Sequence, residues 1–368
     1  MNSQHWEKER DEKGKLGDRL IAYFIGKYKI ARYRTWMLKK EFNETELQPK
    51  YLRRICSQHV SRVTSPLALI AGIQGSGGSL LRRLFDGHPE LHAHPGELML
   101  GYSGDDVRPR IDLSDAPERW LETFFGDMDS EYLEEGHKNG GDDDETFPFV
   151  FLPSLQKTIF LDYVHSIQST RLRDVFDAYM TSYFGAWLSN RNYSNRKKFV
   201  TAFAPALTTV RGNVEFFFEV YPDGRLIFLV RDPRNWFPFA AEHWPRTYGD
   251  AGPAASQWNE SGRAMLWSKE RYGDRICVIK FEDLINKTET VMRYLADLLG
   301  IQFGDILLVP TFDKFPIKAR GEFEVEDHAI ANGAVEKQGV LAKQKLDTIE
   351  RMTSETYAAV LNKVIRYE

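Results

Sequence analysis

The chain has 368 residues, a formal net charge of −4 and two cysteines. This length fits one large α/β domain with attachments, and the slightly acidic balance argues against a nucleic-acid partner. Cys56 and Cys277 lie far apart in the sequence, which favours structural thiols over a disulfide. Residues 1–18 are charged throughout and residues 20–30 are interrupted by lysines, so neither a signal peptide nor a bilayer span is indicated. These features predict a cytoplasmic protein.

Residues 1–64 are predicted to form a basic, helical N-terminal extension. From Arg19 to Arg54 ten Lys or Arg stand against three acidic residues, with tyrosines and a tryptophan between them. We interpret this segment as a helix packed on the core with its charges in solvent. The alternative is a helix that lies on a membrane surface or binds a polyanion.

Residues 65–368 are predicted to form an α/β domain organised around residues 67–85. The apolar run 67–71 has the length and composition of a buried strand, residues 72–78 are rich in glycine, and a helical pattern follows Ser79. The order strand, glycine loop, helix brings backbone N–H groups and a helix N-terminus together at one point. That arrangement favours binding of a phosphate.

The glycine loop can be compared with the nucleotide-binding pattern G-x-x-x-x-G-K-[ST]. Gly72, Gly77 and Ser79 fit this pattern, but Gly78 stands in place of the lysine. A nucleotide kinase needs that lysine to hold the β- and γ-phosphates. The loop is therefore predicted to bind a phosphate but not a triphosphate, and a merely well-packed glycine turn is the alternative.

Residues 89–97 follow the loop's helix and are expected to return the chain across the mouth of the first strand. His94 and Glu97 are therefore candidates for a general base beside the bound phosphate. The alternative for each is a helix cap or a solvated loop residue.

Residues 101–150 are predicted to form an acidic insert. Nine acidic residues lie between Asp127 and Glu145, around a glycine-containing run. The insert is interpreted either as a mobile lid over an acceptor or as a solvated loop without a role.

The remaining pattern predicts strands at 199–203, 225–230 and 275–280, with helices over 155–190, up to 218, after 284 and near 345–365. Strands separated by helices indicate a parallel sheet covered by helices. Arg231 stands at the carboxyl end of one strand, where α/β sheets bind ligands, and is predicted to hold a phosphate. The alternative is an arginine that pairs with Asp232 or a neighbouring carboxylate.

Three of these segments resemble a known family, the PAPS-dependent sulfotransferases. Residues 73–89, which end in Leu-Phe-Asp-Gly-His-Pro, resemble its 5′-phosphosulfate loop. Residues 226–235, with Leu-Val-Arg-Asp-Pro-Arg, are similar to its 3′-phosphate strand and loop, and residues 275–301 contain a Phe-Glu-Asp-Leu motif like the family's Tyr-Glu-Asp-Leu. The resemblance covers about residues 65–325 and implies a P-loop-nucleotide-kinase-like three-layer sandwich that uses PAPS and releases 3′,5′-ADP.

The resemblance also implies roles for individual residues. The 5′-phosphosulfate would be held by Gln74, Gly75, Ser76, Gly77, Gly78, Ser79 and Leu80. Arg231 would hold the 3′-phosphate, and Arg320 lies where the family's C-terminal loop folds over the nucleotide. Glu97 falls in a Gly-Glu pair that matches the general-base glutamate of some glycan, tyrosyl-protein and bacterial members.

Two positions depart from the family pattern. The family has Arg or Lys where this chain has Gly75, and a serine where it has Phe239. The missing positive charge is expected to come from Arg82, Arg83, Lys318 or Arg320.

The resulting hypothesis is a sulfotransferase that moves a sulfuryl group from PAPS to a hydroxyl or amine of an acceptor, with a carbohydrate as the expected acceptor. A lipid or small metabolite stays open, and the sequence does not indicate the oligomeric state. No convincing cluster of metal ligands stands out in the sequence, so no metal is expected. The alternatives are a P-loop kinase of a small molecule and a nucleotide-binding or membrane-associated scaffold without turnover.

Overall fold

The computed structural model describes residues 31–32, 34–40, 57, 60–98, 111–124, 137–138, 146–147, 150–168, 170–190, 196–205, 207, 210–317, 319–320, 323–326, 329–331 and 343–366. Most of the basic extension, most of the acidic insert, Cys56 and Lys318 lie outside these residues, so the predictions made for them stay predictions. In the described part of the chain, no helix combines the length and the apolar character needed to cross a membrane.

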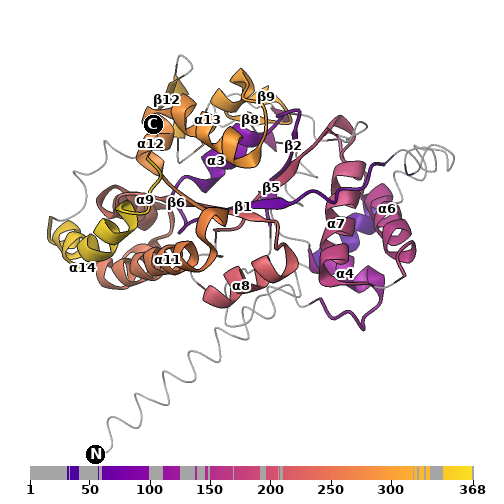
Figure 1. Ribbon diagram of the computed structural model, residues 1–368, viewed down its shortest axis with the longest axis horizontal. Helices are drawn as coiled ribbons and strands as arrows, with labels where there is room; N and C mark the ends of the chain where they lie inside the picture. The colour runs from indigo at the N-terminus through magenta and orange to yellow at the C-terminus, as the bar shows by residue number, and fades with distance from the viewer. Residues whose placement is uncertain are drawn as a thin grey trace, which may run out of the picture.

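A parallel five-stranded sheet lies at the centre of the domain (Figure 1). Its strands are β1 (Leu67–Ala71), β2 (Leu91–Glu97), β5 (Phe199–Phe203), β6 (Arg225–Val230) and β7 (Ile276–Lys280). They lie in the order β2-β5-β1-β6-β7, and every neighbouring pair is parallel. After β1 the chain forms β2 and β5 on one side of this strand, and later β6 and β7 on its other side. The loop after β1 therefore lies where the strand order reverses, which is the usual place for a ligand in such sheets.

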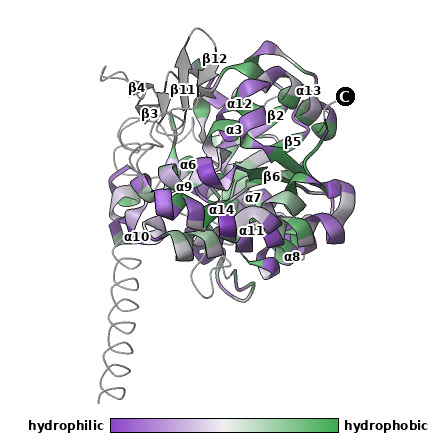
Figure 2. Cartoon of the chain, turned by 90° about the vertical axis from the view of Figure 1, so that its left-hand side faces the viewer, coloured by the Kyte–Doolittle hydropathy of each residue, from purple (hydrophilic) through white to green (hydrophobic). Residues whose placement is uncertain are grey.

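Helices cover both faces of the sheet, which makes the three-layer sandwich predicted from the sequence. One face carries α3 (Gly78–Phe85), α12 (Phe281–Asn286) and α13 (Thr288–Leu299); the other carries α7 (Leu172–Ala186), α8 (Arg211–Val220), α9 (Pro233–His243), α11 (Ala251–Tyr272) and α14 (Lys343–Leu361). Along β1, Leu67, Leu69 and Ala71 face the α8–α11 side whereas Ala68 and Ile70 face α3. The inner strands β5 and β6 accordingly lie in a green, hydrophobic part of the cartoon in Figure 2.

Smaller elements complete the described chain. They are α4 (Pro117–Thr123), α6 (Pro153–His165), α10 (Pro245–Tyr248), the 3-10 turns η1 (Leu188–Asn190), η3 (Gly273–Arg275) and η4 (Asp305–Leu308), and the short strands β3 (His137–Lys138), β4 (Thr146–Phe147), β8 (Thr311–Phe312), β9 (Phe315–Pro316), β10 (Ala319–Arg320), β11 (Phe323–Glu326) and β12 (Ala329–Ala331).

Residues 34–40 of the basic extension are helical, with Trp36 and Met37 buried. Arg34 pairs with Glu122 of α4 at 2.6 Å, so this part of the extension packs on the domain.

The predicted strands and helices are confirmed with small shifts of their ends. Helix α13 stops at Gly300, whose φ of 61° is left-handed, as expected for a glycine just past a helix end. Cys277 is free and buried in β7, as predicted, and burial raises the pKa of its thiol to about 12.

Residues 89–97 differ from the expectation of a connecting segment, because most of them form the edge strand β2. The reason is a strand alternation that the two prolines and two histidines obscure. Leu91 and Ala93 pack on the α3 side of the sheet, while His92 and His94 point to the opposite side, toward α7.

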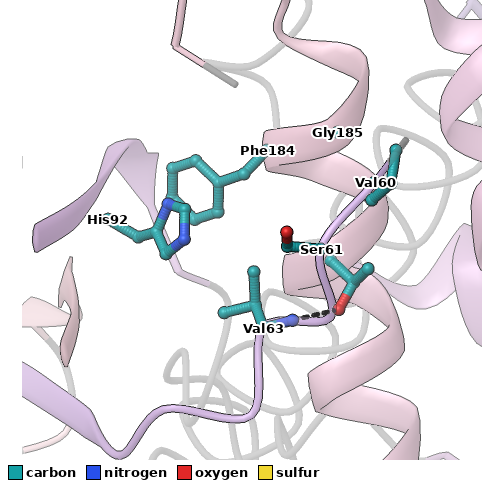
Figure 3. A pocket seen from close by; sticks show the side chains of 7 residues that line it. Val60, Ser61, Val63, His92, Phe184 and Gly185 are labelled. Carbon is teal, nitrogen blue, oxygen red and sulfur yellow. Dashed lines mark hydrogen bonds between the residues drawn. The ribbon is translucent and has the colours of Figure 1, made fainter. Parts of the chain in front are cut away.

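Both histidines of β2 are buried without charge. The His92 ring lies 4.4 Å from the Phe184 ring, beside a cavity of about 10 Å³ that Val60, Ser61 and Val63 also line (Figure 3). Neither ring nitrogen of His92 has a hydrogen-bond partner in the described chain. Burial lowers the pKa of His92 to about 3 and that of His94 to about 4.

We therefore expect folding to become less favourable as the pH falls below about 6.5. The unfolded chain binds protons on both histidines below that pH, but the folded protein does not until about pH 4 for His94 and about pH 3 for His92. Each histidine should contribute about 1.4 kcal/mol per pH unit in that window. Denaturant unfolding of the wild type and of His92→Leu between pH 7.5 and 5 measures this effect. As the pH falls, the free energy of unfolding of the variant should drop by about 1.4 kcal/mol per pH unit less than that of the wild type. Parallel pH profiles would contradict the low pKa of His92.

Candidate active site

The loop between β1 and α3 is shaped by backbone hydrogen bonds and by glycines in left-handed conformations. Ser76 N donates to Ile73 O at 3.1 Å, and Leu81 N donates to Gly77 O at 3.1 Å, which starts the helix. Gly75 and Gly77 have φ values of 80° and 93°, and no side chain caps α3. The first N–H groups of α3 therefore face the space above the loop, where an anion would be stabilised.

Two of the glycines leave no room for side chains. A Cβ atom at Gly77 would overlap the ring of Phe281, and one at Gly78 would overlap the ring of Phe203. A lysine at position 78, as nucleotide kinases have, could fit only if Phe203 moved. This packing gives a physical reason for the missing lysine noted in the sequence.

The three motifs noted in the sequence meet beneath this loop. Arg231 Nη1 donates to Gly75 O at 2.8 Å, and Phe281 lies below Gly77 with its ring 4.6 Å from the Arg231 guanidinium. Glu282 Oε1 accepts the N–H of Asp232 at 2.9 Å. The Phe-Glu-Asp-Leu motif thus joins β7 to the loops that follow β1 and β6.

Arg231 is fully buried, and Asp232, one of the carboxylates expected to pair with it, pairs with its neighbour Arg234. Arg234 Nη2 lies 2.8 Å from Asp232 Oδ2. Arg231 is directed at the loop backbone through Gly75. Whether it also binds a 3′-phosphate stays a prediction.

The start of the loop is fixed by two aromatic side chains. Trp236 Nε1 donates to Gln74 O at 2.7 Å, and Tyr248 Oη donates to Gln74 Oε1 at 3.1 Å. Ser76 is buried, and its hydroxyl has no hydrogen-bond partner in the part of the chain that the structure describes. A hydroxyl without a partner beside exposed helix N–H groups fits an anionic ligand.

Ser79 and Leu80 lie at the beginning of α3 and differ in exposure. Ser79 is half-buried, whereas Leu80 is fully buried in the core on the α3 side of the sheet. Of this pair, only Ser79 offers a hydroxyl at the mouth of the loop.

Glu97 and His94 lie on opposite faces of the sheet. Glu97 ends β2 in register with Phe203, the residue whose ring closes the space at Gly78, and it is half-buried. His94 is fully buried on the α7 side, with Nδ1 3.2 Å from Gly96 O and its ring 4.5 Å from that of Tyr183. This geometry favours a structural role for His94, and its catalytic role stays a prediction.

Two arginines in the last turn of α3 are buried. Arg82 and Arg83 are 2% and 1% exposed, although such side chains usually lie in solvent. Arg83 stacks on Phe312 at 5.0 Å, and neither Nε nor Nη1 of Arg82 has a hydrogen-bond partner among the described residues. Arg320 falls in β10, and its side chain lies outside the description.

Sequence reasoning missed the aromatic side chains that hold the loop. Phe203, Phe281 and Trp236 looked like ordinary core residues, because their contacts join segments far apart in the sequence. Phe239 was noticed only as a residue in the place of a serine. A signal was nevertheless present, since four glycines in seven positions require close neighbours or unusual backbone angles.

Comparison with known proteins agrees with this architecture. A model of the sulfotransferase family matches residues 66–305, well over half of the chain. The chain therefore belongs to the sulfotransferase family. A search of curated proteins finds no match.

Several solved structures are similar to this chain. The sulfotransferase domain of the Synechococcus PCC 7002 olefin synthase is 22% identical, with a TM-score of 0.46 over 81% of this chain and 96% of that domain. The sulfotransferase domain from the curacin biosynthetic pathway is 17% identical, with a TM-score of 0.43 over 81% and 99%. Sulfotransferase STF9 from Mycobacterium avium is 12% identical, with a TM-score of 0.40 over 80% and 77%.

We predict that Gly77→Ala destabilises the protein by about 3 kcal/mol, because the new methyl group meets the Phe281 ring at a left-handed backbone position. Gly300→Ala is the matched control. Its φ is also positive, but nothing lies within 4 Å of the added Cβ, so only conformational strain of about 1 kcal/mol is expected. Denaturant unfolding of both variants gives the comparison, and equal losses would show that Phe281 does not restrict the loop.

Proposed function

We propose that the chain transfers a sulfuryl group from PAPS to a hydroxyl or amine of an acceptor. The observation that carries the proposal is the glycine loop at the uncapped N-terminus of α3, which offers amides to an anion and has no room for a kinase lysine at Gly78. PAPS, when bound, supplies the activated sulfuryl group and leaves as 3′,5′-ADP. The predictions that Arg231 holds the 3′-phosphate and that Arg320 lies in the loop that folds over the nucleotide stay part of this proposal.

The described residues offer what the transfer requires of a protein. Sulfuryl transfer needs hydrogen-bond donors and positive charge near the leaving phosphate. It does not need a triphosphate bridged by a metal ion. The N–H groups at the start of α3, with the hydroxyls of Ser76 and Ser79, would stabilise that charge. The guanidinium groups of Arg231, below the loop, and Arg82, on α3, supply positive charge nearby.

Glu97 is the residue we propose as general base. It ends β2 beside the residue that closes the loop, so its carboxylate can accept the acceptor's proton as the new S–O bond forms. We propose a carbohydrate acceptor and a cytoplasmic location. The first rests on the resemblance of the Gly-Glu pair to glycan and bacterial members, and the second on the sequence prediction.

The first expected outcome concerns ligand binding. At a hundred times its dissociation constant, 3′,5′-ADP should stabilise the folded protein by about 2.7 kcal/mol, which thermal unfolding detects. ATP with Mg²⁺ should give no comparable shift, because the loop lacks the lysine that holds the terminal phosphates. A shift with Mg-ATP and none with 3′,5′-ADP would support the kinase alternative instead.

The second expected outcome concerns turnover. Glu97→Gln should lower kcat for sulfuryl transfer from PAPS by about 10²- to 10⁴-fold, because the amide cannot accept the proton. Its affinity for 3′,5′-ADP, measured by calorimetry, should stay unchanged. Full turnover in the variant would remove Glu97 from the mechanism, and nucleotide binding without transfer to any acceptor in the wild type would support the scaffold alternative.

A further inference from the structure

Phe239 lies against the phosphate loop rather than in the core. Its side chain is only 4% exposed, yet it belongs to neither of the hydrophobic clusters that flank the sheet. Its neighbour Phe237, on the same helix α9, is fully buried within the cluster on the α11 side. Phe239 is instead buried by the His243 ring, which stacks on it at 4.0 Å, by Trp244 at 5.9 Å and by contacts at the loop.

The first of these contacts is with Gly75. A Cβ atom there would lie 3.0 and 3.1 Å from two ring carbons of Phe239 and 3.3 Å from Trp244. Gly75 also has a φ of 80°, which side chains rarely adopt. Phe239 therefore occupies the space into which a side chain at position 75 would extend.

The second contact is with Arg231. The guanidinium carbon lies 5.0 Å from the Phe239 ring centre and 4.6 Å from the Phe281 ring centre, and Nη1 donates to Gly75 O at 2.8 Å. A desolvated cation that faces two aromatic rings is attracted to both. The two rings thereby restrict the guanidinium to the position from which it reaches the carbonyl of Gly75.

We propose that Phe239 is a positioning residue. Together with Phe281 it holds the Arg231 guanidinium against the Gly75 carbonyl, so that this positive charge acts on the loop through a hydrogen bond to the loop backbone. The two departures from the family pattern, at Gly75 and Phe239, then pack as one unit, because the same ring lies against Gly75 and against the Arg231 guanidinium. Through the loop backbone Arg231 then also supports binding of the 5′-phosphate, in addition to the 3′-phosphate that the proposed function assigns to it.

The test compares Phe239→Leu with Phe237→Leu, the same change on the same helix but away from the loop. Calorimetry measures the affinity for 3′,5′-ADP and for adenosine 5′-monophosphate, which lacks the 3′-phosphate. Phe239→Leu should weaken adenosine 5′-monophosphate about tenfold and 3′,5′-ADP at least as much. Phe237→Leu should lower the melting temperature but leave both dissociation constants unchanged. Loss of affinity for 3′,5′-ADP alone would show that the ring serves a 3′-phosphate site and would overturn the proposal.

A second variant separates positioning from general damage to the fold. Arg231→Lys keeps the charge but loses the planar group that reaches Gly75 between two rings. If Phe239 acts through Arg231, the double variant should bind both nucleotides no more weakly than the weaker single variant. Effects that multiply would mean that the two residues act separately and would contradict the proposal.

Hydrogen exchange gives a readout that does not depend on any nucleotide. In the free protein, Phe239→Leu should speed amide exchange in the peptide that covers residues 72–79, whereas Phe237→Leu should leave that peptide unchanged. Unchanged exchange in Phe239→Leu would overturn the positioning role. If the wild type binds neither nucleotide, the proposed function fails, and the exchange comparison still decides the role of Phe239.

Discussion

The site depends on the close approach of aromatic rings to a backbone that has no side chains of its own. Phe203 reaches Gly78, Phe281 reaches Gly77 and Phe239 reaches Gly75, each at a distance that a Cβ atom would prevent or strain. The rings come from β5, α12 and α9, so the loop is held by three segments that follow it in the chain. A glycine-rich loop is otherwise free to adopt many conformations, and this packing selects one of them.

This packing also determines which positions near the loop can carry a positively charged side chain. A side chain at position 78 is excluded by Phe203, and one at position 75 would crowd Phe239 at a left-handed backbone angle. The positive charge beneath the loop comes instead from Arg231, which reaches the loop backbone at Gly75. Buried guanidinium groups polarise backbone amides strongly because little water screens them. The loop can therefore remain electropositive although no basic residue lies within it.

Much of the fold could be predicted from the sequence, because four of the five central strands are short apolar runs next to clear helical patterns. The edge strand β2 was missed, since its two buried histidines and a proline hide the alternation of a strand. The glycine loop and Arg231 could be assigned to the site from local spacing and from the family resemblance. The contacts of Phe203, Phe239 and Phe281 could not, because each joins positions that only the folded sheet brings together, and an aromatic residue in a helix or strand otherwise indicates core packing.

The alternation along β2 explains why two neighbouring candidates have different surroundings. Successive side chains of a strand point to opposite faces, so His92 and His94 share the α7 face, whereas Leu91 and Ala93 share the face of α3 and the phosphate loop. The pairing with β5 is irregular between Ala93 and Glu97 and resumes with Glu97 opposite Phe203, which packs on the α3 side. A general base at the end of this strand must lie at the same height along the sheet as the loop, and on the α3 face of the sheet, where the loop lies. Glu97 meets both conditions, whereas the imidazole of His94 is buried behind the sheet among the rings of α7.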